Sequence, residues 1–136
     1  MTAGQRGSAA IEAVLVAPVV LVLVALLIGG GRVTSAQAAL ATVAREAGRV
    51  AVTAPTSEQA VAWGQERARE VAAGYRLDAS RLRVSIRPGA FERGSDVFIA
   101  VSYSVGLSDL PSLGLVPGSA SLRATHVEPI DAHISR

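Results

Sequence analysis

The side chains best suited to chemistry gather near the C-terminus, where His126, Glu128, Asp131 and His133 follow one another closely. Imidazole and carboxylate groups are the usual protein ligands of zinc and other divalent metals. His126 and Glu128 would share one face of a strand, but Pro129 should end that strand before the other two residues. Because no second cluster completes a set of four ligands, we predict an exposed polar tail and no metal site.

The sequence also lacks the G-x-S-x-G, H-E-x-x-H and strand-to-helix Gly-rich motifs of common active sites. Its densest glycine run, Gly29–Gly31, ends an apolar segment instead of following a strand. The chain has no cysteine and no lysine, which excludes disulfides, thiolate nucleophiles and Schiff-base chemistry. We therefore predict no catalytic residue, no cofactor, no small-molecule substrate and no enzyme activity.

The composition points to one small domain with an unusually apolar portion. The chain has 136 residues, of which 50% are hydrophobic, only 4% are aromatic and 25 are alanine. All 13 cationic side chains are arginine, and the formal net charge is only +2. Arg81, Arg83 and Arg87 would form a polyanion patch on one strand, but aromatic residues are not interleaved with them. We interpret them as a solvated strand face and predict no nucleic-acid partner.

Much of the apolar content lies in one uncharged segment, Ala13–Gly31, which has 19 residues. As a helix it would be roughly 28 Å long, close to the hydrocarbon thickness of a bilayer. Pro18 should kink this helix, which lipid tolerates better than water does. The first seven residues carry Arg6 and no acid, so the positive-inside rule predicts a cytoplasmic N-terminus and an extracytoplasmic remainder.

An ordinary signal peptide is the alternative interpretation of this segment. Ala36-Gln37-Ala38 matches a small-residue cleavage site, and a cut after Ala38 would release a small secreted binding domain. Arg32 fits that interpretation poorly, because it lies between the apolar segment and the site. Glu12 also fits poorly, because a carboxylate at the bilayer edge is costly unless it has a partner.

The residues around Glu12 resemble the prepilin-peptidase site of the type IV pilin superfamily. Gly7 and Ser8 precede the glutamate, and the apolar segment follows it directly. The pattern is most similar to the TadE/TadF group of pilin-like (pseudopilin) proteins from tight-adherence (Flp, type IVb) pilus systems. Pro18, the end at Gly31-Arg32 and the stretch Ala44–Arg49 also resemble that group, over about residues 7–52. Ala13 departs from it, because relatives often carry an aromatic residue there.

The resemblance implies a structural, membrane-anchored minor pilin that a prepilin peptidase cuts between Gly7 and Ser8. Its partners would be the membrane, the peptidase, the major Flp-type pilin, other minor pilins and the inner-membrane assembly platform. It would be a single-pass inner-membrane protein, or would reach the pilus or cell surface. Glu12 would then serve processing or assembly.

The physical role of Glu12 has two interpretations. In a bundle of apolar helices, its carboxylate would pair with the new α-amine of Ser8, in its own or a neighbouring subunit. A misplaced subunit would leave a charge unpaired at a cost of several kcal/mol, so the pairing would favour one register. Alternatively, Glu12 only flanks a membrane anchor and extends to the head groups.

The remaining sequence predicts a small α+β head. Residues 32–53 should extend the N-terminal helix, and Thr56 with Gln59 predicts a capping box that opens a second helix ending near Gly74. In that helix we predict Trp63 to be a packing anchor, with a role as a binding residue as the alternative. Alternating apolar residues then predict strands at about 82–86, 97–105 and 120–127.

The expected fold class is therefore α+β and pilin-like: a long N-terminal helix, a second helix and a three-stranded antiparallel sheet. The expected parts are a leader at 1–7, a transmembrane helix at 8–31, its extension at 32–53 and an extracytoplasmic head at 54–136.

Overall fold

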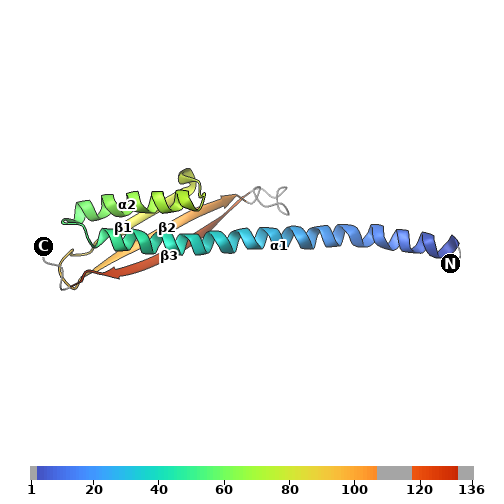
Figure 1. The fold of residues 1–136 in the computed structure, drawn as a ribbon, viewed down its shortest axis with the longest axis horizontal. Helices are drawn as coiled ribbons and strands as arrows, with labels where there is room; N and C mark the ends of the chain where they lie inside the picture. The colour runs from blue at the N-terminus through green and yellow to red at the C-terminus, as the bar shows by residue number, and fades with distance from the viewer. Residues whose placement is uncertain (1–2, 107–117, 132–136) are drawn as a thin grey trace. The chain divides into compact units, whose positions relative to one another are not determined.

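The computed structural model describes residues 3–106 and 118–131, with side chains described from residue 11 onward (Figure 1). The chain divides into two units, which are described separately below. The N-terminal unit contains the chain up to Val33, and the head unit contains Thr34–Val105 together with the residues from Ser119 onward.

Helix α1 runs from Ala3 to Ala51 and includes the apolar segment. The large apolar side chains between Ile11 and Ile28 are exposed in the N-terminal unit. Burying one such side chain away from water is worth about 1.5–3 kcal/mol. Within the described part of the chain, α1 is the helix long and apolar enough to cross a membrane. The predicted long N-terminal helix is confirmed.

The head contains the end of α1, helix α2 (Ser57–Gly74), the short 3-10 helix η1 (Ala79–Arg81) and three strands. The predicted cap of α2 is present, because the Thr56 hydroxyl accepts a hydrogen bond from the Gln59 backbone N–H at 3.2 Å. The strands are β1 (Leu82–Arg87), β2 (Asp96–Gly106) and β3 (Ser119–Pro129). The predicted α+β class and three-stranded sheet are confirmed.

The strands pair in the order β1-β2-β3, and β1 runs antiparallel to β2 with Leu82 opposite Tyr103 and Arg87 opposite Phe98. Gly94, in the connection between these two strands, has a φ of +77°, which glycine adopts without strain. The end of β3 is tied to this turn, because the Ile130 N–H donates to the Ser95 carbonyl at 2.9 Å.

The core consists of small and aliphatic side chains from both helices and one face of the sheet. Gly64 of α2 allows α2 to approach both β1 and α1, because a Cβ atom there would overlap Ile86 Cδ1 of β1 and lie 3.2 Å from the Ala47 carbonyl oxygen of α1. Gly48 of α1 allows the sheet to approach α1 closely, since a Cβ atom there would lie 2.9 Å from Ile99 Cδ1 of β2. The buried residues are Leu40, Val43, Ala44, Ala47, Ala51, Val52, Ala54, Ala60, Ala68, Ala72, Ile86, Val97, Ile99, Val101, Ala124 and Ile130.

One residue that we predicted to pack in the core lies on the surface of the head. Trp63 was expected to anchor the packing of α2, but its exposed fraction is 44%, and that prediction is wrong. The buried side of α2 is instead formed by Ala60, Gly64, Ala68 and Ala72, which follow one another at a spacing of four. Only small side chains fit between α2 and α1 at this distance, so the indole is left on the outside.

Two charged groups stabilise the helical part of the head. Arg67 of α2 binds Glu46 of α1 at 3.2 Å and Glu70 at 2.9 Å, and these hydrogen bonds raise the pKa of its guanidinium, with Glu70 as the larger cause. Asp78 caps η1 by accepting hydrogen bonds from the hydroxyl and the N–H of Ser80. These bonds lower the pKa of the Asp78 carboxyl.

Candidate functional site

The predicted processing segment lies in the first turns of α1. The backbone at Gly7 and Ser8 is helical, so Ser8 and Glu12 are one helical turn apart on the same side of the helix. The Glu12 side chain is exposed. After a cut at residue 7, the new α-amine would therefore lie on the helix side that carries the carboxylate. The cut itself and the role of Glu12 stay predictions.

Pro18 lies inside α1, one and a half turns beyond Glu12. Its ring removes one backbone hydrogen-bond donor from the helix. The exposed apolar side chains around it are Val14, Leu15, Val16, Val19, Val20, Leu21 and Val22. The predicted kink at Pro18 stays a prediction.

The alternative signal-peptidase site falls in the middle of α1. Gln37 lies within it, and its side-chain amide donates a 2.7 Å hydrogen bond to the Arg123 carbonyl of β3. The next residues, Ala39 and Leu40, are already buried in the head. A cut after Ala38 would thus remove the Gln37 contact and leave the first buried turn of the head at a chain end.

The C-terminal cluster is brought together only in part. His126 Nε2 and Glu128 Oε2 lie 2.6 Å apart on the face of β3 that packs over Gly48 of α1. Both side chains are half-buried, so the prediction of an exposed polar tail is wrong for these two residues. Asp131 is exposed, and His133 lies outside the described residues. Over residues 11–106 and 118–131, no three metal-ligating side chains come together.

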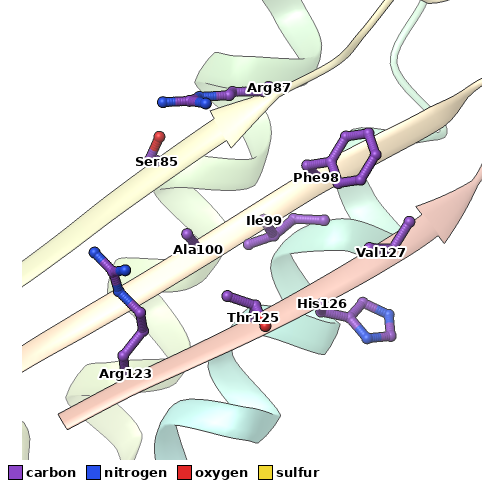
Figure 2. A pocket seen from close by; sticks show the side chains of 9 residues that line it. All are labelled: Ser85, Arg87, Phe98, Ile99, Ala100, Arg123, Thr125, His126 and Val127. Carbon is purple, nitrogen blue, oxygen red and sulfur yellow. The ribbon is translucent and has the colours of Figure 1, made fainter.

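One face of the sheet is left uncovered by the helices and strands of residues 3–106 and 118–131, and it was not predicted from the sequence as a surface of interest. Figure 2 shows the side chains of Arg87, Phe98, Arg123 and Val127 on this face, with both helices behind the sheet. Phe98 is 51% exposed and lies directly opposite Arg87 in the strand register. The hollow on this face has a volume of about 630 Å³, and its lining also includes the outward-facing residues Ser85, Ala100 and Thr125.

Comparison with protein families concerns the N-terminal segment. The family model described as TadE-like protein matches residues 7–49 of the chain. Residues 7–49 are TadE-like. The predicted resemblance is thereby confirmed, and the TadE-like match includes Gly7, Ser8, Glu12 and Pro18.

The TadE-like match ends within the last turn of α1, so it covers the apolar segment and the part of α1 that packs in the head. TadE-like proteins are structural, pilus-associated membrane proteins, and no enzyme activity defines the family. No curated protein and no solved structure matches the chain.

Proposed function

We propose that this protein is a minor pilin-like subunit of a tight-adherence pilus or a related secretion machine. The observation that carries the proposal is the position of Glu12. An exposed carboxylate directly precedes a long uncharged helical segment, inside a match to TadE-like proteins that begins at the residue before the expected cut. In a plain membrane anchor, Glu12 would only flank the helix and extend to the head groups, with no part in processing or assembly.

In this proposal a prepilin peptidase cuts between Gly7 and Ser8 on the cytoplasmic side of the inner membrane. Residues 8–31 stay in the mature protein as a transmembrane helix, and the head lies outside the cytoplasm. Arg6 and the N-terminal amine support this orientation, because cytoplasmic flanks of membrane helices carry an excess of positive charge.

Glu12 then selects the assembled arrangement of subunits. In a bundle of α1 helices the carboxylate lies in a medium of low dielectric constant, where an isolated charge is costly. The α-amine of Ser8, one turn away or on the neighbouring subunit, neutralises it. The major Flp-type pilin, other minor pilins and the assembly platform are the partners that such a subunit would contact.

The decisive experiment is to determine the mature N-terminus of the protein produced in its native host, by intact mass and N-terminal peptide mapping. The proposal requires a start at Ser8 in the membrane fraction. A start at Ala39 in the medium would show instead a secreted domain released by an ordinary signal peptide. An uncut chain would leave only a membrane anchor.

A matched pair of variants locates the cut. Gly7→Val adds a branched side chain at the residue before the proposed cut and should leave the protein uncut in the membrane. Gly4→Val makes the same change three residues earlier and should be processed normally. Equal processing of both variants would contradict a cut at Gly7.

A further inference from the structure

The uncovered sheet face combines positive charge with exposed apolar side chains. Arg83 and Arg87 of β1 and Arg123 of β3 contribute three exposed guanidinium groups. No carboxylate of the described residues forms an ion pair with them, whereas the exposed arginines of α2 are paired. Phe98 and Val127 stay 51% and 46% exposed on the same face. We call the face formed by these five residues the open sheet face.

The opposite side of the head presents a complementary surface. Trp63, Glu66 and Glu70 follow one another along α2 at spacings of three and four, so they form one stripe. All three residues are exposed. Glu66 has only a 3.9 Å contact with Arg69, and Glu70, although it binds Arg67 at 2.9 Å, keeps an exposed side chain. We call these three residues the α2 stripe. It offers one large aromatic ring next to two carboxylates.

We propose that the open sheet face of one copy of this chain binds the α2 stripe of a second copy. The indole of Trp63 would pack on Phe98 and Val127, and the carboxylates of Glu66 and Glu70 would pair with the arginines around them. A hollow of about 630 Å³ is large enough for an indole ring with its neighbours. Exposed aromatic residues and arginine are the residue types that contribute most to protein interfaces.

Charge decides how the two copies face each other. If the open sheet faces of two copies met, the arginines of one would face the arginines of the other. This repulsion costs free energy and disfavours such a symmetric contact. The open sheet face and the α2 stripe attract each other instead. Helix α2 packs on the covered side of the sheet, through Gly64 and Ile86, so its outer stripe points away from the open sheet face. The contact is therefore heterologous, and repeated contacts of this kind build rows instead of closed dimers.

The biological setting of this contact rests on the proposed function, since a pilus subunit has to meet its neighbours in a row. The contact itself depends only on the head. Crosslinking of heads and cleavage at Gly7 are thus separate measurements, and either can fail without the other.

Cysteine crosslinking tests the contact in the full-length protein in its native membrane. Because the chain contains no cysteine, introduced thiols are unique. Two differently tagged copies are coproduced, one with Ala62→Cys, directly before Trp63, and one with Thr125→Cys, which lines the hollow between Arg123 and Val127. Both are treated with a short bismaleimide, and Trp63 and Phe98 stay intact. We expect a crosslinked pair that contains both tags. Crosslinking should be much weaker when both copies carry Thr125→Cys, or when Glu92→Cys, at an exposed loop position, replaces Thr125→Cys.

Charge reversal provides the second test. Arg123→Glu in the Thr125→Cys copy should reduce the crosslink about tenfold, because like charges then oppose each other. Adding Glu66→Arg to the Ala62→Cys copy should restore it. Both positions are exposed, so the variants should unfold at the wild-type temperature, which circular dichroism checks.

Three results would overturn the proposal. The first is a Thr125→Cys crosslink between identical copies as strong as the mixed one. The second is a mixed crosslink no stronger than that of the Glu92→Cys control. The third is a crosslink from Thr125→Cys to a cysteine of a different protein in place of a second copy.

Discussion

Gly64 of α2 lies so close to α1 that a Cβ atom at position 64 would be only 3.2 Å from the carbonyl oxygen of Ala47. The oxygen belongs to the backbone of a helix and cannot turn away as a side chain can. This contact fixes how closely the two helices of the head approach each other. It also explains why the buried side of α2 consists of glycine and alanine.

Substituting Gly64 should therefore weaken the head. Gly64→Val forces α2 away from α1 and should lower the free energy of unfolding by about 1–3 kcal/mol, the usual cost of overpacking a core. Gly74→Ala is the matched control, because nothing lies within 4 Å of a Cβ atom there. It should leave stability unchanged or raise it by up to about 1 kcal/mol through helix propensity. Thermal unfolding of the detergent-purified protein measures both, and equal midpoints would contradict the packing argument.

The Arg67 bridge between the helices should matter more than other ion pairs of the head. Arg67→Met removes the hydrogen bonds to Glu46 and Glu70 while keeping an unbranched stem. We expect a lower unfolding temperature at low ionic strength, and a smaller loss in high salt because salt screens exposed charges. Arg69→Met, which removes only a 3.9 Å contact with Glu66, should have little effect. The bridge has no special role if the two variants unfold alike.

Asp78 should make the head sensitive to acid. Its folded-state pKa lies below the ordinary value of 3.8, so its stabilising effect is present above that pH and is lost as the pH falls through the folded pKa. Asp78→Ala should therefore be less stable than wild type from pH 7 down to about pH 5, and the difference should vanish in stronger acid. Denaturant unfolding across this range measures it. Asp96→Ala, at an exposed carboxylate of β2, should show no such convergence.

Glu12→Gln should separate membrane insertion from assembly. The amide keeps the size of the side chain but cannot neutralise the amine of Ser8, so insertion should persist while processing or copurification with pilus components is lost. Glu92→Gln makes the same change in the head and should behave as wild type. Fractionation, intact mass and affinity copurification provide the readouts. Normal processing and normal copurification of the Glu12→Gln variant would contradict the proposed role of Glu12 in processing or assembly.

The elements of the fold could be predicted where local chemistry specifies them. Thr56 and Gln59 marked the start of α2, since a hydroxyl three residues before a backbone N–H is a local signal. The alternation of Leu82, Val84 and Ile86 marked β1 in the same way. The TadE-like segment was predictable as well, because Gly7, Ser8 and Glu12 lie close together in sequence.

Features that depend on contacts between distant segments could not be predicted. In a helix as rich in alanine as α2, several faces look equally apolar, and only the approach of α1 selects the one with Gly64. For that reason Trp63 was wrongly predicted to lie on the buried side of α2. The open sheet face was missed because Phe98 and Arg123 join Arg87 only through strand pairing. The arginines of one strand therefore looked like an ordinary solvated surface.

The order of the strands has a consequence for the folding of the head. Each strand pairs with its neighbour in sequence, so the loops that must close are short and pairing is fast. The buried turns of α1 are synthesised before the segments that cover them. Strand β3 completes this cover, because its His126 and Glu128 lie over Gly48. A chain that stops before Ser119 would leave this surface of α1 open, so the head reaches its native state only after β3 has been synthesised.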